Sequence, residues 1–307
     1  SMQTPTHLSA DDSLFDLGKL INYLLSKWKL FALFGFLFAI IFAAISTQLP
    51  NRYTSETVLV AADSGATGME NLAGQLGGLA SLAGVNLNSG KDKSLLAIQV
   101  LKSHQFLVDF VKTHQLAVSL FAVESWDIET DTFVYNEKKY DASVKKWHQR
   151  SDKPISYYPT DLEIHKEMSS LLDIEVDKAN QVTKVSLSYY EPKLTQKWLT
   201  LLVKDLNDRV RAEEIREREE QISFLQKQLE QETNSEIRNV FYNLIEEQLK
   251  SSTLAKARAE FAFKVIDPAL MPEEKSSPKR ALITILGGLV GGVLCFVVLT
   301  LVFLFRK

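Results

Sequence analysis

The sequence is poor in the residues on which most catalytic and metal sites depend. The single cysteine, Cys295, excludes an intrachain disulfide and every metal motif that needs two thiolates. The five histidines are never four residues apart and form no H-x-x-E-H pattern, so a zinc site has little support. The commonest serine-hydrolase motif, G-x-S-x-G, is absent. We therefore expect no enzyme activity, no catalytic residue, no metal and no cofactor. A glycosidase is disfavoured rather than excluded, because its two catalytic carboxylates can be far apart in the sequence and brought together only by the fold.

Glycine is absent between residues 91 and 286, so no nucleotide-binding loop is available there. The nearest candidate lies just before this range, where five residues separate Gly84 from Gly90 and Asp92 follows the lysine. A P-loop needs four residues between its glycines, and a Ser or Thr after the lysine to hold magnesium. We reject this segment as a phosphate site.

Charge is absent from two long stretches. The 22 residues from Leu30 to Asn51 contain no Lys, Arg, Asp or Glu, and neither do the 25 residues from Ala281 to Phe305. Helices of these lengths reach about 33 and 37 Å, enough to cross a hydrocarbon core of about 30 Å. The sequence therefore predicts two transmembrane helices, at residues 30–51 and 281–305.

Basic residues on the outer sides of both spans predict the topology. Lys27 and Lys29 precede the first span, and Arg306 and Lys307 follow the second, which favours cytoplasmic termini and an external segment at 52–280. A cleaved signal peptide is the alternative for the first span, but its n-region would be unusually long and no A-x-A site is present, so we favour an uncleaved anchor. The two residues after the second span would leave no cytoplasmic output domain, which argues against a receptor.

The overall charge argues against nucleic acid as a partner. Lysine and arginine number 35 against 38 acidic residues, a net charge of −3, and the excess acid lies between the spans. No basic patch with interleaved aromatic residues is present, so we expect no nucleic-acid binding.

The external segment mixes strand and helix patterns and predicts a small α/β base domain. We expect helices within 94–120 and 161–172, and an irregular surface at 124–158. Strands are expected at 53–60, at 172–176 and 182–187 as a hairpin, and at 261–266. The glycine- and leucine-rich segment 65–90 has two interpretations, a mobile loop or a surface that orders against a neighbour or ligand.

The most telling element begins at Pro192, a residue suited to the first turn of a helix. No glycine or further proline follows as far as Glu232, and apolar residues recur at helical spacing. Thr233 and Glu236 then have the spacing of a capping box and can start a second helix, to about Ala259. The pattern predicts a long helical hairpin that projects away from the membrane.

Two sets of residues are candidates for contacts between helices or subunits. Within Arg209–Glu220, nine of twelve residues are charged, and this predicts either a solvated helix face or inter-subunit salt bridges in a ring of such helices. The residues that would form the bridges are Arg209, Arg211, Glu213, Glu214, Arg216, Glu217 and Arg218. In the second span two overlapping G-x-x-x-G patterns give a ridge that favours close packing with the first span or a second copy; its members are Gly287, Gly288, Gly291 and Gly292.

The predicted fold class is an α+β membrane protein, in which two transmembrane helices flank a periplasmic α/β base domain with a long projecting helical hairpin. The segments are a cytoplasmic N-terminal segment at 1–29, transmembrane helix 1 at 30–51, the base domain at 52–191, the hairpin at 192–260, a returning strand and proline-rich segment at 261–280, transmembrane helix 2 at 281–305 and a cytoplasmic tail at 306–307.

This layout resembles the Wzz-type chain-length determinants, the polysaccharide co-polymerases of Gram-negative inner membranes. The entry to the first span, Asp16 to Lys29, is similar to that of the family, and so is Tyr189-Tyr190-Glu191-Pro192 with the helix after it. The most specific match is Phe263 to Arg280, which resembles the proline-rich segment that precedes the second span in the family. Its prolines here are Pro268, Pro272 and Pro278, more widely spaced than in the richest versions.

The resemblance implies a non-enzymatic protein that sets the modal chain length of lipopolysaccharide O-antigen, or of a related undecaprenyl-linked polysaccharide. It implies a homo-oligomeric ring, an octamer, in the inner membrane, with both termini cytoplasmic and most of the chain periplasmic. The implied partners are a second copy of the chain, the O-antigen polymerase, the membrane and the growing lipid-linked polysaccharide. The alternative is a periplasmic scaffold or adaptor of a polysaccharide export machine.

Overall fold

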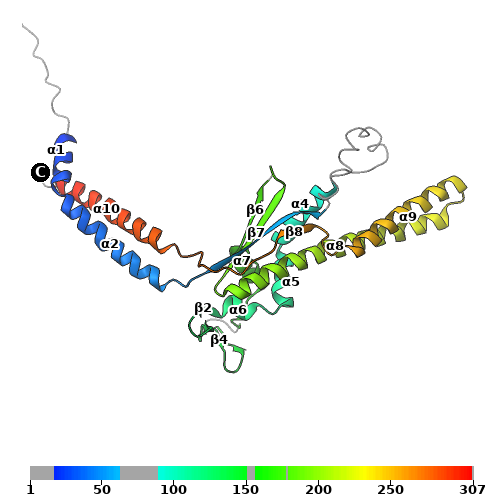
Figure 1. The fold of residues 1–307 in the computed structure, drawn as a ribbon, viewed down its shortest axis with the longest axis horizontal. Coiled ribbons are helices and arrows are strands. Elements are labelled where there is room, and N and C mark those ends of the chain that lie inside the picture. Colours follow the sequence, from blue (N-terminus) through cyan, green and yellow to red (C-terminus); the bar gives the residue numbers. More distant parts are fainter. Residues whose placement is uncertain (1–16, 63–88, 151–155, 178, 306–307) are drawn as a thin grey trace, which may run out of the picture. The chain divides into compact units, whose positions relative to one another are not determined.

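The computed structural model describes residues 17–62, 89–150, 156–177 and 179–305 (Figure 1). The chain forms two compact units, one made of Ser1–Pro50 with Ser277–Lys307 and the other of Asn51–Ser276. Most of the glycine- and leucine-rich segment 65–90 lies outside the described residues, so neither of its two interpretations is tested.

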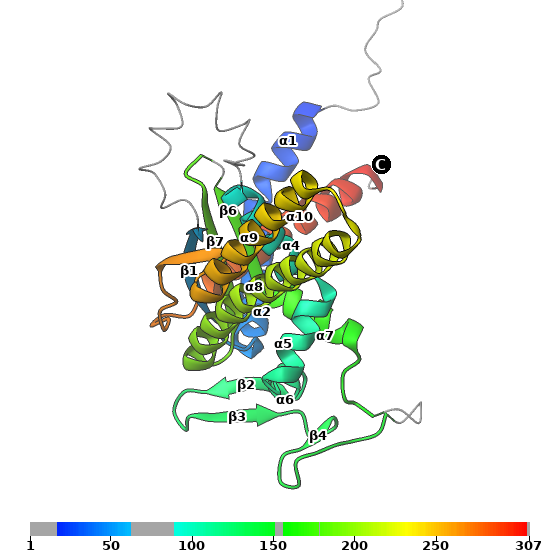
Figure 2. The same ribbon diagram turned by 90° about the vertical axis from the view of Figure 1, so that its right-hand side faces the viewer.

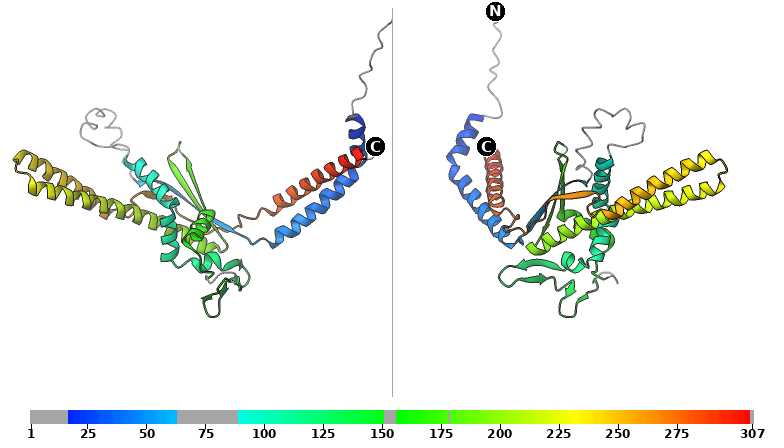
Figure 3. Two further views of the ribbon diagram at one scale, coloured as in Figure 1. Left: turned by 180° about the vertical axis from the view of Figure 1, so that it is seen from behind. Right: turned by 45° about the vertical axis from the view of Figure 1, so that its right-hand side comes forward.

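The first unit consists of α1 (Leu17–Ser26), α2 (Trp28–Gln48) and α10 (Arg280–Phe305). The views of Figure 3 agree in placing α2 and α10 side by side. Their most apolar windows have mean hydropathies of 2.5 and 2.7, yet only 6% and 17% of the residues in them are buried. A helix that is apolar all round and remains uncovered suits lipid better than a protein core. These are the two helices that the uncharged stretches predict.

The second unit is built on a four-stranded sheet with the order β6-β7-β1-β8. Its strands are β1 (Tyr53–Ala61), β6 (Leu172–Asp177), β7 (Val182–Tyr189) and β8 (Phe263–Asp267), and every neighbouring pair is antiparallel. Alternation along β1 buries every second residue, from Tyr53 to Ala61. The predicted α+β fold class is confirmed.

Among its described residues, the base of this unit also has four short helices: α4 (Ser89–Lys102), α5 (His104–Thr113), α6 (Ala117–Phe121) and α7 (Asp161–Leu171). Ser103 caps α5 by accepting a hydrogen bond from the Phe106 backbone N–H. Thr160 and Glu163 form a reciprocal capping box at the start of α7. The apolar faces of these helices share one core with the sheet, as the burial of Val111, Ile164 and Leu187 shows.

The hairpin pairs α8 (Pro192–Gln231) with α9 (Ser235–Ala257) (Figures 1 and 2). Glu191 caps α8 by accepting from the backbone N–H groups of Lys193 and Leu194, and Pro192 occupies the first turn as predicted. The first half of α8 packs on the sheet, where Trp198 is buried together with five leucine and valine residues of the same helix. Beyond Val210 no side chain of α8 is buried within the chain. At about 1.5 Å per residue, the 40-residue helix is about 60 Å long, so its far half extends well past the base.

The prediction of an irregular surface at 124–158 is wrong. Two small antiparallel ribbons lie there: β2 (Val123–Asp127) pairs with β3 (Thr132–Tyr135), and β4 (Tyr140–Asp141) pairs with β5 (Lys146–Trp147). Their turns lack glycine, and Asp131 and Lys145 adopt the positive φ values of 51° and 53° that glycine usually supplies. Without glycine at these turns, the sequence lacks the usual hairpin signal.

The predicted start of the second hairpin helix is wrong by one residue. The cap is Asn234 rather than Thr233, and its side chain accepts from the Glu236 backbone N–H, which is 2.9 Å away. Asparagine is at least as good a cap as threonine, so the two adjacent candidates could not be separated by residue type.

Candidate functional site

The glycine ridge of α10 faces α2, but its four members differ in how closely they approach it. A Cβ atom on Gly287 would lie 2.5 Å from the Phe42 side chain, and one on Gly291 would lie 2.7 Å from the Phe34 carbonyl oxygen. A Cβ on Gly288 would make ordinary contacts, and one on Gly292 would meet nothing within 4 Å. Gly287 and Gly291 therefore permit the close approach of the two helices, whereas Gly292 does not contribute to it.

The proline-rich segment is held by hydroxyl groups of β1. The Ser55 and Thr57 hydroxyls donate to the carbonyls of Leu270 and Asp267, at 2.7 and 2.8 Å. The Gln196 side chain donates to the Ala269 carbonyl at 2.8 Å. Because Pro268 has no N–H, the chain cannot continue the ladder of β8 past Asp267, and side-chain bonds to its carbonyls fix it instead.

The other prolines share this irregular segment without forming a cluster. Pro268 is exposed and Pro272 is half-buried. Further along, the Ser276 N–H donates to the Arg52 carbonyl at 2.9 Å, which ties the end of the segment to the residue before β1. Pro278 belongs to the other compact unit, at the entry to α10. The segment is thus an anchored connection, and its prolines are spread along it.

The charged run of α8 forms pairs largely within the chain. Arg216 pairs with Glu213 and Glu220 on the same helix, and this guanidinium holds the pKa of Glu213 below its usual range. Arg218 binds Glu214 at 2.6 Å and reaches across the hairpin to the Gln248 side-chain oxygen at 2.9 Å.

The remaining members of the run lie nearer the base or point to solvent. Arg211 pairs with Asp208 at 2.6 Å, and the Arg209 guanidinium lies 3.8 Å from an oxygen of Asp109. Glu217 is exposed and has no ion pair among the described residues. The predicted bridges to a second subunit stay a prediction, and most of these side chains would have to exchange a partner within their own chain to form them.

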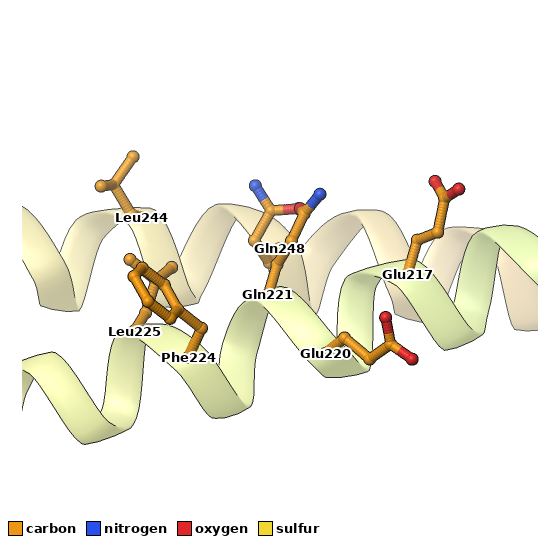
Figure 4. A pocket seen from close by; sticks show the side chains of 7 residues that line it. All are labelled: Glu217, Glu220, Gln221, Phe224, Leu225, Leu244 and Gln248. Carbon is orange, nitrogen blue, oxygen red and sulfur yellow. The ribbon is translucent and has the colours of Figure 1, made fainter.

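The hairpin also carries a shallow groove of about 480 Å³ between its two helices. Figure 4 shows Phe224 and Leu225 on α8 opposite Leu244 on α9, with Glu217 and Glu220 further along α8. The Phe224 side chain is 61% exposed, and the following residues of α9 are also apolar and exposed: Ile237, Val240, Tyr242, Leu249 and Leu254. The residues of α9 are spread around that helix, whereas Phe224, Leu225 and Leu244 lie together in the groove. An exposed apolar groove on a projecting element is typical of a protein–protein contact.

One structurally important side chain, Asn207, was not predicted. It is buried in α8, where its side-chain oxygen accepts from the N–H groups of Ala262 and Phe263 at 2.9 Å each. Its amide donates to the Phe263 carbonyl at 2.9 Å. These bonds satisfy the backbone at the start of β8, where the returning chain leaves the hairpin. A polar residue on an apolar helix face was the only signal in the sequence.

The described residues contain no group of three His, Cys, Asp or Glu side chains close enough to hold a metal ion. His114 instead pairs with Asp205, the two side chains being 2.7 Å apart, and His104 stacks beside His165 at 5.3 Å between ring centroids. The features gathered here are therefore contacts between helices and open surfaces.

Comparison with known proteins gives a match at the N-terminal end of the chain. Residues 13–114 match the Wzz family model, described as chain length determinant protein. This range contains α2, β1 and α5, and it stops before the proline-rich segment on which the resemblance in the sequence rests most strongly. A comparison with curated proteins finds no match.

Two solved structures are similar at low identity. One is titled "full-length bacterial polysaccharide co-polymerase", with 15% identity over 95% of this chain and 98% of that chain, and a TM-score of 0.37. The other is a fragment of WzzB, a polysaccharide co-polymerase from Salmonella Typhimurium, with 14% identity over 74% of this chain and 100% of that chain, and a TM-score of 0.32. The family match at residues 13–114, about a third of the chain, agrees with the resemblance to the Wzz-type chain-length determinants that the sequence predicts.

Proposed function

We propose that this protein regulates the modal chain length of lipopolysaccharide O-antigen, or of a related undecaprenyl-linked surface polysaccharide. It acts with the polymerase as an oligomeric ring in a Gram-negative inner membrane, and it neither makes nor breaks a glycosidic bond. The single observation that carries the proposal is the family match at residues 13–114. In this arrangement both termini are cytoplasmic and residues 52–280 are periplasmic.

The long hairpin supports the oligomeric part of the proposal. In the far half of α8 no side chain is fully buried, and Phe224 of α8 and Leu244 of α9, which share one groove, are exposed in the single chain. Two helices that cover each other on one side only are weakly stable alone, because helix stability in proteins comes mainly from packing of the apolar face. A neighbouring copy of the same hairpin would cover this face, and repetition around a closed ring would cover it on every subunit.

The experiment that tests the function compares the lipopolysaccharide ladder of the source strain with and without this gene. A strain that lacks the protein should lose its modal band and show a distribution without a preferred length, and a plasmid copy should restore the band. An unchanged ladder in the deletion strain would refute the proposed function. If the purified protein still formed a ring, the alternative of a scaffold or adaptor of an export machine would then be favoured.

The non-enzymatic part needs its own measurement. Purified full-length protein incubated with isolated lipopolysaccharide should leave the ladder unchanged, since regulation of this kind would act through the polymerase. Shortened glycan in this incubation would overturn the proposal. Replacement of single exposed carboxylates would then identify the residues responsible.

A further inference from the structure

The two small ribbons carry a row of aromatic rings, here called the aromatic row: Phe133, Tyr135, Tyr140, Trp147 and Tyr158. Successive ring centroids are 6.4, 6.0, 5.2 and 5.8 Å apart, and the rings are tilted or edge to face. These are favourable arrangements for aromatic pairs. Figure 2 shows the ribbons beside α6, where β2 contacts that helix. The row holds together two ribbons that are each too small to be stable alone.

A pocket of about 650 Å³ opens along one side of the row. Its wall includes Phe133, Val134 and Tyr135 of β3, Tyr140 and Asp141 of β4, and His148. The volume falls within the range of about 300–1,000 Å³ that is usual for small-molecule sites. Stability of the ribbons does not require all of this wall, because Val134 is 47% exposed and His148 is exposed.

The polar side chains of the wall can form further hydrogen bonds beyond those within the chain. One carboxylate oxygen of Asp141 accepts from the backbone N–H groups of Ser143 and Val144, at 2.9 and 3.2 Å. The other oxygen has no hydrogen bond to the described residues. The imidazole of His148 likewise has none, although its backbone pairs with Lys139 and Tyr157. A rigid acceptor and a free imidazole beside ring faces are suited to orient a ligand that has both apolar and hydroxyl surfaces.

Sugars have this combination of surfaces. A pyranose presents C–H groups on its flat face, which stack on aromatic rings, and hydroxyls around its edge, which both donate and accept hydrogen bonds. Among the described residues that line the pocket, Glu137 and Asp141 are acidic and none is Lys or Arg. Carboxylates in the wall accept hydrogen bonds from hydroxyl and amino groups and repel an acidic group in direct contact with them. The wall therefore favours neutral or amino sugars at contact, while Lys138, Lys139, Lys145 and Lys146 lie outside it in the same ribbons. A lipid surface is flat and does not enter a recess of this kind.

We propose that this pocket binds a short neutral or amino-sugar stretch of polysaccharide, held against the ring of Tyr135 and oriented by Asp141 and His148. The inference rests on the proposed function in glycan length control, and it adds to that function a place and a sugar class for direct contact with the polymer.

The test uses the full-length protein in detergent and an array of bacterial surface oligosaccharides that includes neutral, amino and acidic sugars. The wild type should bind neutral or amino oligosaccharides, and the strongest of them is then titrated by calorimetry. Tyr135→Ala should weaken binding roughly tenfold, through loss of one stacking ring. His148→Ala should also weaken binding, and it keeps the fold intact because only its backbone is bonded.

The matched control is Tyr158→Ala. Tyr158 ends the aromatic row but does not line the pocket, so its removal perturbs the row and should leave sugar affinity unchanged. If the near-ultraviolet circular dichroism shows that Tyr135→Ala disturbs the packing of the aromatic row, the sugar affinity of His148→Ala is used to test the pocket instead. Wild type that binds only acidic sugars or none, or His148→Ala with wild-type affinity, would overturn the inference.

Two further outcomes separate this inference from its alternatives. Protein held in neutral-lipid nanodiscs should not float with anionic phosphatidylglycerol vesicles. Flotation that Tyr135→Ala abolishes would assign the row to a membrane surface and overturn the inference. If deletion of the gene changes the glycan ladder while wild-type protein binds no sugar, the proposed function stands and the pocket proposal fails. If sugar binds and deletion leaves the ladder unchanged, the proposed function fails.

Discussion

Asn207 connects the hairpin to the sheet through three hydrogen bonds from one side chain. Its partners are the backbone groups of Ala262 and Phe263, and the site is closed to solvent. Water does not reach these backbone groups to replace the lost hydrogen bonds. Removal of the Asn207 side chain therefore lowers the free energy of unfolding by the penalty for several unsatisfied backbone groups.

We predict that Asn207→Ala destabilises the protein by about 2–4 kcal/mol, because two N–H groups and one carbonyl lose their partner. Denaturant unfolding, followed by the fluorescence of Trp198 and the other tryptophans, measures the change. Lys204→Ala, one turn earlier and on the exposed side of α8, should unfold at nearly the wild-type denaturant concentration. Equal effects of the two substitutions would mean that the bonds of Asn207 contribute nothing.

The capping box of α7 predicts a dependence of stability on pH. The Thr160 backbone N–H and the Arg150 guanidinium both donate to Glu163, and these bonds hold the pKa of that carboxyl below its usual 4.5. A carboxyl with a lowered pKa in the folded state adds stability above its unfolded pKa, and this contribution is lost as pH falls through the folded pKa. Glu163→Gln should therefore lower Tm at pH 7, and the difference from wild type should narrow below pH 4.5. A Tm difference that stays constant down to pH 3 would contradict the assignment.

At the scale of elements, the contact between α2 and α10 depends on which glycines of α10 face α2. In lipid, helix association is driven mainly by close packing, because no water is released from apolar surfaces. A Cβ on Gly291 would lie 2.8 Å from the Phe38 Cβ atom, too close without movement of the helices, whereas Gly292 has open space.

We predict that Gly291→Leu separates the two spans and Gly292→Leu does not. The two variants add the same side chain at adjacent positions of one helix, so they have the same change in hydrophobicity. Thermal unfolding of the full chain in mild detergent should show a lower Tm for Gly291→Leu alone, and mass measurement shows whether oligomer size follows. The same Tm for both variants would mean that the close approach is not needed for stability.

Elements with a local signal could be predicted from the sequence. The β6–β7 hairpin has alternating apolar and polar residues around Asp177–Asn180, strictly in β6 and partly in β7, and α8 has a proline start and a long helical period. The ribbons β2–β5 could not, because Asp131 and Lys145 replace the glycine that marks such turns. Asn207 could not either, since its partners are more than fifty residues away in the chain. The four glycines were predicted as one set, and only the position of α2 separates Gly291 from Gly292.

For the whole molecule, the first question is on which side of the membrane the larger unit lies. An even number of spans and the basic flanks at Lys27 and Lys29 predict a periplasmic position for residues 52–280. Ser170, exposed at the end of α7, is a suitable reporter. In a Cys295→Ala background, Ser170→Cys should react with a membrane-impermeant thiol reagent once the outer membrane is permeabilised. Labelling that requires lysis of the inner membrane would reverse the topology.

The second question is whether the exposed face of the hairpin holds the assembly together. Phe224 lies at the centre of the groove between α8 and α9, with Leu244 opposite, and 61% of its surface is exposed. Its position beyond Val210 places it away from the core of the base, so a substitution there should leave the sheet and its helices folded. The face can therefore be tested in the full chain without loss of the fold.

We predict that Phe224→Glu reduces the oligomer and broadens the glycan ladder, because a carboxylate in an apolar contact between copies must lose its hydration without gaining a partner. Gln226→Glu is the matched control, since it adds the same charge two residues along α8, about 200° around the helix axis and so on nearly the opposite face. Mass measurement of the detergent-solubilised protein and lipopolysaccharide gels of complemented strains give the two results. A smaller oligomer with an unchanged ladder would separate assembly from length control. An unchanged oligomer would mean that the spans and the base domain hold the ring, and that the exposed face of the hairpin serves another partner.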